Sequence, residues 1–328
     1  MDDNKLTPKV DLQVVLGMII TLVLLATITF FTIKQPSQII YNPQTIPNPS
    51  PLGYTFSLVM FIVPALVIKW WFLTNPEYKV EKKAYWTTIL ILTPIGFLLD
   101  MIFGNSFFSF DNKAATMGID LFGYVFGQGW GRNIPIEEFI FYFTGFLALL
   151  LIYVWGDMYW FGAYNVDDYP SATQRLDKII SLHIPTLLVF LGLVAFAFIY
   201  KNYFAQPPYL GGIPGYFLFL MCVLAPTIFL IKAALPFVNW RALSFSLFFL
   251  LFLSLLWEGT LGVPYAWWGY RPAQMMGIIM LPMASLPLEA VSVWFLTTWT
   301  TIIFYEVIKI YLYMGRPFKQ AMLGGGAP

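Results

Sequence analysis

The sequence predicts an all-α, polytopic membrane protein with about eight transmembrane helices, arranged as two parallel four-helix repeats. The first observation is composition: 59% of the 328 residues are hydrophobic, 11% are charged, and the mean hydropathy is +0.72. The second is that several apolar runs approach the roughly 20 residues that a helix needs to cross the hydrocarbon core of a bilayer. The third is an internal repeat of the whole pattern. Soluble globular domains do not combine these features.

Charged and turn residues separate the apolar runs and predict the boundaries of the spans. In chain order, the expected spans are 12–33, 53–74, 84–103, 134–155, 177–200, 214–235, 241–258 and 286–312. The first run is too long for the apolar part of a signal peptide and lacks a small-residue cleavage site, so we expect it to be retained. Pro64, Pro94 and Pro226 fall inside spans, where buried membrane helices tolerate proline with a local kink.

Lysine and arginine residues predict the orientation. If the N-terminus is cytoplasmic, thirteen of the 18 Lys and Arg residues lie on that side, and cytoplasmic loops are enriched in these residues. We therefore expect an integral protein of a prokaryotic inner membrane with both termini in the cytoplasm. Because each half contains an even number of spans, the two halves run parallel and are related by an axis along the membrane normal.

The two halves of the chain carry the same ordered motifs. The matching pairs are Gly53-Tyr54 with Gly215-Tyr216, Asp100 with Glu258, Met117-Gly118-Ile119 with Met276-Gly277-Ile278, and Pro135-Ile136-Glu137 with Pro287-Leu288-Glu289. The pattern predicts a first repeat over 1–157 with a Pro-Ile-Glu-Glu motif, a cytoplasmic linker over 158–176, a second repeat over 177–315 with a Pro-Leu-Glu-Ala motif, and a C-terminal tail over 316–328. Duplicated membrane folds place sites between their repeats.

Carboxylates in or beside the apolar spans are the candidate catalytic groups, because ionisable residues in a membrane are costly and usually face a cavity or the bundle interior. They are Asp100, Glu137, Glu138, Glu258 and Glu289. Helix capping is the alternative explanation, since proline followed by glutamate suits the first turn of a helix. Capping does not explain matched acids at the ends of the preceding spans. Nor does it explain the adjacent Glu137 and Glu138, where repulsion between partly desolvated charges favours keeping one carboxyl protonated, as a general acid requires.

Aromatic residues frame these acids, and electron-rich ring faces can stabilise cations. The candidate substrate-binding residues are Trp130, Phe141, Tyr142, Trp257, Tyr265, Trp267, Trp268 and Tyr270. The alternative is an interfacial belt of Trp and Tyr, which membrane proteins build in any case. For the Ala-Trp-Trp-Gly-Tyr run beside Glu258 we favour a role in the site.

Several other chemistries are excluded. Iron-dependent desaturases, hydroxylases and oxygenases of membranes hold iron with several histidines, whereas this chain has only His183. No Gly-x-Gly-x-x-Gly fingerprint joins a strand to a helix. The net charge of +1 argues against a nucleic-acid partner. We therefore expect no metal and no cofactor, and a chemistry that uses carboxylates and aromatic rings.

The motifs resemble those of the lycopene cyclase domain family. The shared features are an acid at the end of one span, an aromatic-rich loop with Met-Gly-Ile, and Pro-Ile-Glu-Glu-Phe-Ile-Phe over 135–141 at the start of the next span. That family occurs as paired small membrane subunits in some bacteria, as fused copies in other bacteria and archaea, and as the cyclase part of fungal bifunctional proteins. The resemblance covers mainly 84–155 and 241–312. The second copy departs from it, since Ala290 stands where the first has Glu138.

The resemblance implies a lycopene β-cyclase-like enzyme, an intramolecular lyase or isomerase. Its partners would be lycopene or a related carotenoid, the lipid bilayer and other enzymes of the carotenoid pathway. A carboxylic acid would protonate the terminal alkene, a neighbouring double bond would close a six-membered ring, and a base would remove a proton to leave a β-ionone-type ring. On this basis we expect Glu137 and Glu138 as the acid centre, with Asp100, Glu258 and Glu289 as partner acids or the base.

Two alternatives stay open. One is another membrane terpenoid cyclase or a carotenoid hydratase, which would use the same acid step with another substrate or with water as the final nucleophile. The other is a proton-coupled transporter, because parallel repeats with intramembrane acids also describe carriers. A carrier should hold an acid near mid-membrane, whereas the acids of this chain lie toward one leaflet, which favours the cyclase.

Overall fold

The computed structural model describes residues 50–76, 80–166, 168–280 and 285–325. Over these residues the chain is mostly helical, and seven helices are long and apolar enough to cross a membrane. This finding confirms the prediction of a helical membrane protein. The expected first span, 12–33, lies outside the described residues.

The seven candidate spans follow the predicted ones closely. They are α2 (Gly53–Thr74), α3 (Lys82–Phe107), α4 (Ile136–Trp155) with the π-helical turn Gly156–Trp160, α6 (Ile184–Tyr203), α7 (Gly215–Leu224) with α8 (Thr227–Ala234), α9 (Trp240–Trp257) with the π-helical turn Glu258–Gly262, and α10 (Leu288–Met314). Two short helices, α5 (Tyr169–Gln174) and α11 (Phe318–Leu323), lie outside the spans. Pro64 and Pro94 lie within continuous helices, whereas Pro226 separates α7 from α8.

The start of one span differs from the prediction, because α6 begins at Ile184 and not at residue 177. The residues before it find backbone partners outside a helix. The N–H of Ile179 donates to the carbonyl of Ala321, and the N–H of His183 donates to that of Ile228. The helix then starts with a proline in its first turn, where a missing N–H costs nothing. The segment before α6 is therefore held against α8 and α11.

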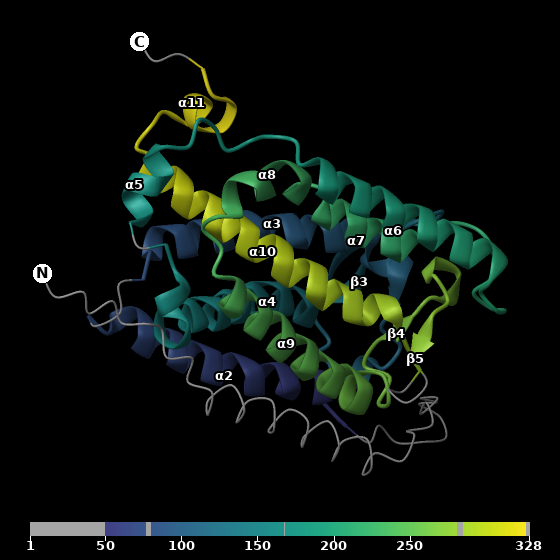
Figure 1. Ribbon diagram of the computed structural model, residues 1–328. Coiled ribbons are helices and arrows are strands. Elements are labelled where there is room, and N and C mark those ends of the chain that lie inside the picture. Colours follow the sequence, from purple (N-terminus) through teal and green to yellow (C-terminus); the bar gives the residue numbers. More distant parts are fainter. Residues whose placement is uncertain (1–49, 77–79, 167, 281–284, 326–328) are drawn as a thin grey trace, which may run out of the picture.

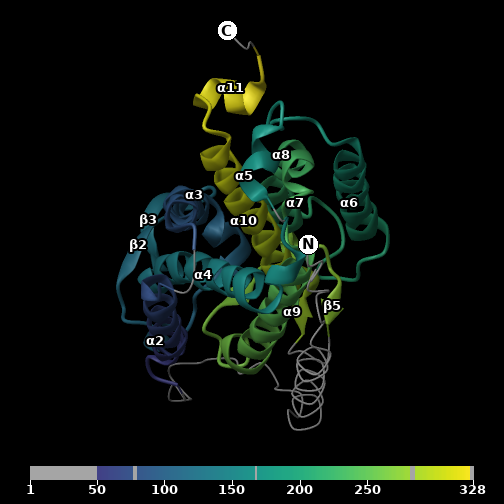
Figure 2. The ribbon, with the colours of Figure 1, turned by 60° about the vertical axis from the view of Figure 1, so that its left-hand side comes forward.

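Helices α4 and α10 form the centre of the bundle (Figures 1 and 2). Helix α3 packs against both of them, and so does α9. Helix α2 packs on α4, α7 and α8 pack on α10, and α6 lies on the outer side of α7 and α8. Helices from the two halves of the sequence are thus interleaved across the bundle, and the contacts among α2, α3 and α4 correspond to those among α7, α9 and α10.

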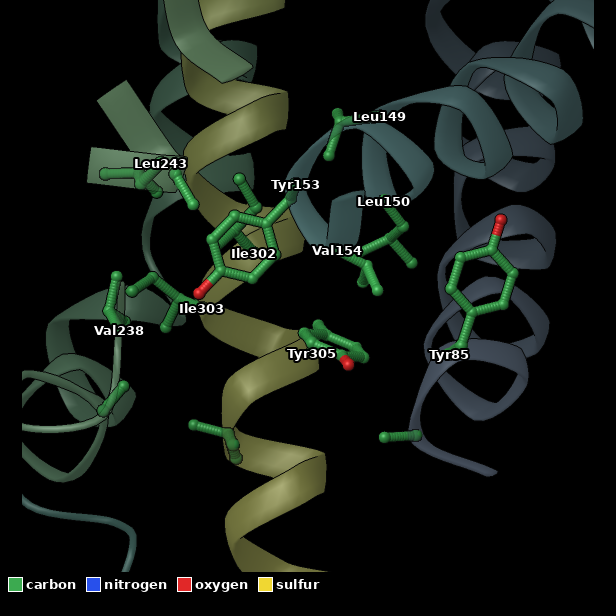
Figure 3. Close-up of a cluster of buried hydrophobic side chains, with 14 of the residues drawn as sticks. Tyr85, Leu149, Leu150, Tyr153, Val154, Val238, Leu243, Ile302, Ile303 and Tyr305 are labelled. Atoms are coloured by element: carbon green, nitrogen blue, oxygen red, sulfur yellow. The ribbon is translucent and has the colours of Figure 1, made fainter. Parts of the chain in front are cut away.

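A dense apolar core joins α3, α4, α9 and α10 (Figure 3). Leu150 of α4 and Ile302 of α10 are fully buried in it. Tyr85 of α3 is also fully buried, and its hydroxyl donates to the carbonyl of Leu147 at 3.0 Å. This core fixes the relative positions of the helices that carry the predicted acids.

Short antiparallel strand pairs gather at one end of the bundle, which we call the hairpin end (Figure 1). They are β1 (Phe108–Ser109) with β4 (Gly269–Tyr270), β2 (Asp120–Val125) with β3 (Gly129–Pro135), and β5 (Ile279–Met280) with β6 (Leu286–Pro287). The first pair joins the two halves of the chain. In the other two pairs Asp120 faces Pro135 and Ile279 faces Pro287. Each half therefore enters its Pro-x-Glu helix in the same register.

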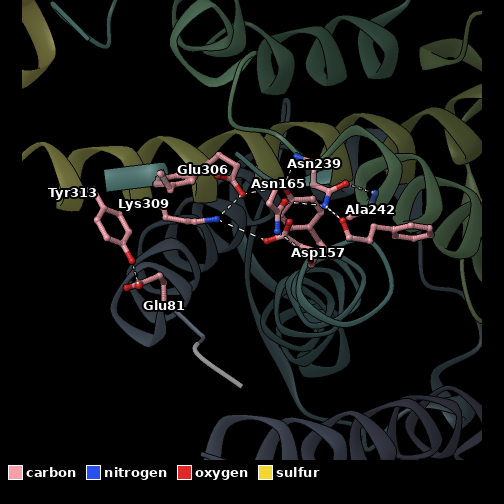
Figure 4. Close-up of polar contacts among 11 residues, drawn as sticks. Glu81, Asp157, Asn165, Asn239, Ala242, Glu306, Lys309 and Tyr313 are labelled. Atoms are coloured by element: carbon pink, nitrogen blue, oxygen red, sulfur yellow. Dashed lines mark hydrogen bonds and ion pairs between the residues drawn. The ribbon is translucent and has the colours of Figure 1, made fainter. Parts of the chain in front are cut away.

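A buried polar network holds the opposite end together (Figure 4). The Glu306 carboxylate is fully buried and accepts hydrogen bonds from the hydroxyls of Tyr153 and Tyr169, each at 2.9 Å. Lys309 lies 3.4 Å from Glu306 and 3.8 Å from Asp157. Burial, together with the Glu306 charge, raises the pKa of Tyr169. These residues come from both halves and from the connection between them, so the network joins the halves at this end.

Candidate active site

The Pro-x-Glu motif has the same local geometry in both halves. The main-chain N–H of Met117 donates to Glu137 Oε1 at 2.7 Å, and that of Met276 donates to Glu289 Oε1. The next residue is in both cases a glycine with positive φ, +74° and +96°, a conformation that glycine adopts without steric cost. Each glutamate therefore fastens the Met-Gly turn to the start of its helix, which is a positioning role.

The surroundings of these two glutamates differ. Glu137 also accepts a hydrogen bond from Thr55 Oγ1 at 2.6 Å. Glu289 instead interacts with the charge of Lys201, whose buried ammonium group donates to the carbonyls of Met275 and Tyr209. Each carboxyl has one oxygen without a hydrogen-bond partner among the described residues. Neither glutamate lines the cavity that Glu138 and Glu258 line.

Glu138 and Glu258, from different halves of the chain, line one cavity of about 100 Å³ at the hairpin end. Glu138 lies in the first turn of α4 and is buried. Its Oε1 accepts a hydrogen bond from the Tyr54 hydroxyl at 2.6 Å. Tyr54 is the second residue of α2, so the packing of α2 on α4 positions this contact.

Glu258 reaches the same cavity from the end of α9. Its carboxylate accepts hydrogen bonds from the Tyr270 hydroxyl, from Trp294 Nε1 at 2.8 Å and from Ser254 Oγ at 3.1 Å. Burial, together with the Glu258 charge, raises the pKa of Tyr270, so this phenol stays a neutral donor. Three donors stabilise the ionised form of a carboxyl group. The surroundings of Glu258 therefore favour its ionised form. Among the described residues, Glu138 accepts one side-chain hydrogen bond, from Tyr54.

Aromatic rings make up most of the remaining cavity lining. They are Phe108, Phe110, Phe141, Tyr142, Phe146, Tyr216, Trp257, Trp268, Tyr270 and Trp294. The ring centroids of Trp257 lie 5.4 Å from Phe141 and 5.0 Å from Trp268. Ring faces attract cations, and their apolar surfaces offer water few partners. The cavity can therefore hold a carbocation beside two carboxyl groups.

Asp100 adjoins this cavity without lining it. The side chain is buried on α3, and a Cβ placed on Gly104 would lie only 2.6 Å from its Oδ1. Its Oδ2 has no hydrogen-bond partner within the described part of the chain. The Asp100 charge interacts with Glu138 and with Tyr142. Repulsion between two buried carboxylates favours a proton on one of them.

Three predicted aromatic residues lie away from the cavity lining. Trp130 is 59% exposed near the tip of the β2–β3 hairpin, where its ring contacts Tyr124 across the strands. The hairpin tip carries Trp130 away from the acids, although the sequence places it close to them. Trp267 stacks on Tyr54, and Tyr265 stacks on Trp267. Trp267 therefore contacts Tyr54 directly, and Tyr265 contacts Trp267.

Several lining residues are not among the predicted ones, above all Tyr54 and Tyr216. Both belong to the repeated Gly-Tyr pair, and this recurrence was the signal that could have found them. Trp294 has the same place after Pro287 that Tyr142 has after Pro135. Equivalent residues of the two halves thus face a single cavity from both sides.

Comparisons of the chain with protein-family models, with curated proteins and with solved structures gave no match. Among the described residues, no group of three or more His, Cys, Asp and Glu side chains could hold a metal ion.

Proposed function

We propose that the protein is a membrane carotenoid cyclase, which forms β-ionone-type rings at the ends of lycopene or a related linear polyene. The observation that carries the proposal is the placement of Glu138 and Glu258 at one aromatic-lined cavity. Acid-initiated cyclisation needs a proton donor, a proton acceptor and a dry surface that tolerates a cation. The cavity offers a group for each of these needs.

The two carboxyl groups suit different roles. Glu258 accepts three hydrogen bonds that favour its ionised form, so we assign it as the base. Glu138 accepts one hydrogen bond, from Tyr54, among the described residues, so its ionised form is less stabilised and we assign Glu138 as the acid. Asp100 is then a partner acid, and Glu137 and Glu289 position the starts of their helices.

The proposed reaction is redox-neutral. Glu138 gives its proton to the terminal carbon–carbon double bond, which leaves a tertiary cation. The neighbouring double bond attacks this cation, a new carbon–carbon bond closes the six-membered ring, and the new cation lies among rings such as Trp257 and Trp268. Glu258 removes a proton from the ring and a double bond forms. One proton is added and one is lost, so the product is an isomer of the substrate.

The proposal includes the architecture of the whole chain. Two parallel repeats, the first completed by the expected span 12–33, would put a pseudo-two-fold axis through the cavity. Paired lining residues such as Tyr54 with Tyr216 support this arrangement. With both termini in the cytoplasm of a prokaryotic cell, the hairpin end and the cavity would lie toward the outer leaflet.

Pigment extraction tests the proposed activity. Bacterial cells that make lycopene are compared without the protein, with the wild type, and with Glu138→Gln. The cyclase proposal expects a ring-containing isomer of lycopene with the wild type only. A product heavier by one water would identify a carotenoid hydratase instead. Unchanged lycopene in the presence of the folded, membrane-inserted wild type would contradict the proposal and favour the transporter.

A further inference from the structure

A second, larger cavity adjoins the one that contains the acids. It lies between α3, α7 and α10 and has a volume of about 1210 Å³, above the range of roughly 300–1,000 Å³ that is usual for small-molecule pockets. Tyr142 and Val293 line both cavities, so the two are neighbours. Ile95 and Ile213 line the larger one and are exposed at the surface. The larger cavity therefore opens on the apolar outer face of the bundle.

The lining of this larger cavity suits a hydrocarbon. Leucine, isoleucine, valine and phenylalanine make up 15 of its 29 lining residues, and nine of these 15 belong to α3 and α7. Of the described residues that line it, only Arg271 carries a charge. Its Nε already donates to the carbonyls of Asn105 and Phe108, at 2.8 and 3.0 Å. The remaining polar side chains of the lining are uncharged, and an apolar chain can lie along its aliphatic and aromatic side chains without a polar partner.

The sequence repeat places an equivalent cavity on the other side of the bundle. This cavity lies between α2, α4 and α9 and has a volume of about 50 Å³. The counterparts of ten of its twelve lining residues line the larger cavity; for example, Leu58 corresponds to Leu220, and Leu250 corresponds to Leu92. The two cavities thus occupy equivalent places and differ widely in size.

At three positions the smaller cavity is narrowed by aromatic side chains where the larger one has aliphatic residues. Phe61, Phe141 and Trp257 line the smaller cavity, and the Trp257 ring lies 5.7 Å from Phe61 and 5.4 Å from Phe141 between centroids. The equivalent residues at the larger cavity are Val223, Val293 and Leu99. At these three positions the smaller aliphatic side chains leave more space in the larger cavity than the rings leave in the smaller one.

We propose that the larger cavity is a channel that admits a linear polyene chain sideways from the lipid phase and holds it while its end reacts. This inference rests on the proposed function, because it takes the reacting end to lie between Glu138 and Glu258. A linear polyene is too long for the acid-containing cavity and needs no polar partner for the rest of its chain. Among the described residues, the equivalent place between α2 and α9 has a cavity of only about 50 Å³, so substrate enters beside α3 and α7.

Two substitutions place aromatic residues of the smaller cavity at the equivalent positions of the larger cavity. Leu99→Trp and Val223→Phe introduce the residues found at the equivalent positions, and neither residue lines the acid-containing cavity. The matched control combines Leu98→Trp and Val189→Phe, which add the same side chains to outer surfaces. Leu98 is 58% exposed on α3 and Val189 is 61% exposed on α6.

The experiment uses the full chain in lipid vesicles and a linear polyprenyl probe that carries a diazirine at one end. After illumination, mass spectrometry of peptides locates the attached probe. We expect label on α3 and α7 in the wild type and in the control, and a decrease when excess lycopene is present. In the Leu99→Trp/Val223→Phe variant this label should be lost. Conversion of lycopene by the same vesicles should fall in that variant and not in the control.

The outcomes separate the channel from the proposed activity. Label in the double variant equal to that of the wild type, or wild-type label on α2 and α9 instead of α3 and α7, would overturn the channel. Label that depends on Leu99 and Val223 without any cyclisation by the wild type would support the channel and refute the proposed function. Leu99→Trp and Val223→Phe are also measured separately. If the double variant does not fold, the labelling of the single variants is compared with that of the wild type.

Discussion

Glu138 and Glu258 face the same cavity from different halves of the chain, and each accepts a hydrogen bond from a tyrosine hydroxyl, Tyr54 and Tyr270 respectively. Their surroundings are nonetheless unequal, because Trp294 and Ser254 also donate to Glu258. In the proposed reaction, this inequality makes Glu138 the carboxyl that keeps a proton and Glu258 the one that accepts it.

Substitution of the adjacent glutamates should separate catalysis from positioning. Glu138→Gln removes the proposed acidic proton, so cyclisation should fall by roughly 10²–10⁴-fold, the usual contribution of a general acid. Glu137→Gln should keep most activity, since the amide oxygen can still accept from the Met117 N–H. Rates of lycopene conversion by purified protein in detergent test both. Asp120→Asn, at an exposed ion pair with Lys113, is the matched control.

Heavy water should mark the proton that starts the reaction. The Glu138 proton exchanges with solvent between turnovers, so purified protein acting on preformed lycopene in heavy water should put one deuterium on each new ring. Mass spectrometry of the product measures this uptake, and lycopene incubated without protein is the control. Rings formed without deuterium would rule out a carboxyl as the proton source.

Gly262→Ala should disturb the cavity lining. A Cβ at this position would lie 2.3 Å from ring atoms of Trp268, which lines the cavity, so the ring must move. Small displacements of positioning groups can cost about 10²-fold in rate, and we expect a loss of that order with normal membrane insertion. Gly192→Ala is the matched helical control, because nothing lies within 4 Å of its added Cβ. Equal activity of the two variants would contradict a role for Trp268.

Glu306→Gln should destabilise the protein without removing its chemistry. The change leaves Lys309 and the hydroxyls of Tyr153 and Tyr169 with a neutral partner in a buried network. Removing one partner of a buried ion pair typically costs about 3–5 kcal/mol. The midpoint of thermal unfolding in detergent should therefore drop, whereas activity per folded molecule at low temperature should persist. An unchanged midpoint would show that the network contributes little.

Reporter fusions test the proposed orientation. Fusions at Lys82 and Arg241 should report the cytoplasm, and those at Lys113 and Arg271 the opposite side, because most lysine and arginine residues then lie in cytoplasmic segments. The reverse pattern would move the cavity to the inner leaflet.

The spans and the acids could be predicted because both leave direct signals in the sequence. A helix must be long and apolar to cross a bilayer, and a carboxylate such as Asp100 or Glu258 in an apolar run is conspicuous. The start of α6 was less accessible, since its preceding residues are extended only because α8 and α11 supply backbone partners.

The division of roles among the acids could not be predicted. Glu137 and Glu138 are neighbours in the sequence, and only the Met-Gly turn decides that Glu137 is held by a backbone N–H while Glu138 faces the cavity. The position of Trp130 could not be predicted either. The length of the β2–β3 hairpin sets the distance between Trp130 and the start of α4.

Ala290 occupies the place that the sequence repeat assigns to the counterpart of Glu138. In a symmetric dimer one sequence supplies both subunits, so every substitution appears twice, once on each side of the axis. A single chain with two unequal halves is free of this constraint. It can keep a carboxyl on one side and lose it on the other, and it can fill one flank with aromatic rings while the other stays open. Because both halves belong to one chain, the two sides of the pseudo-two-fold bundle can differ in sequence and therefore in function.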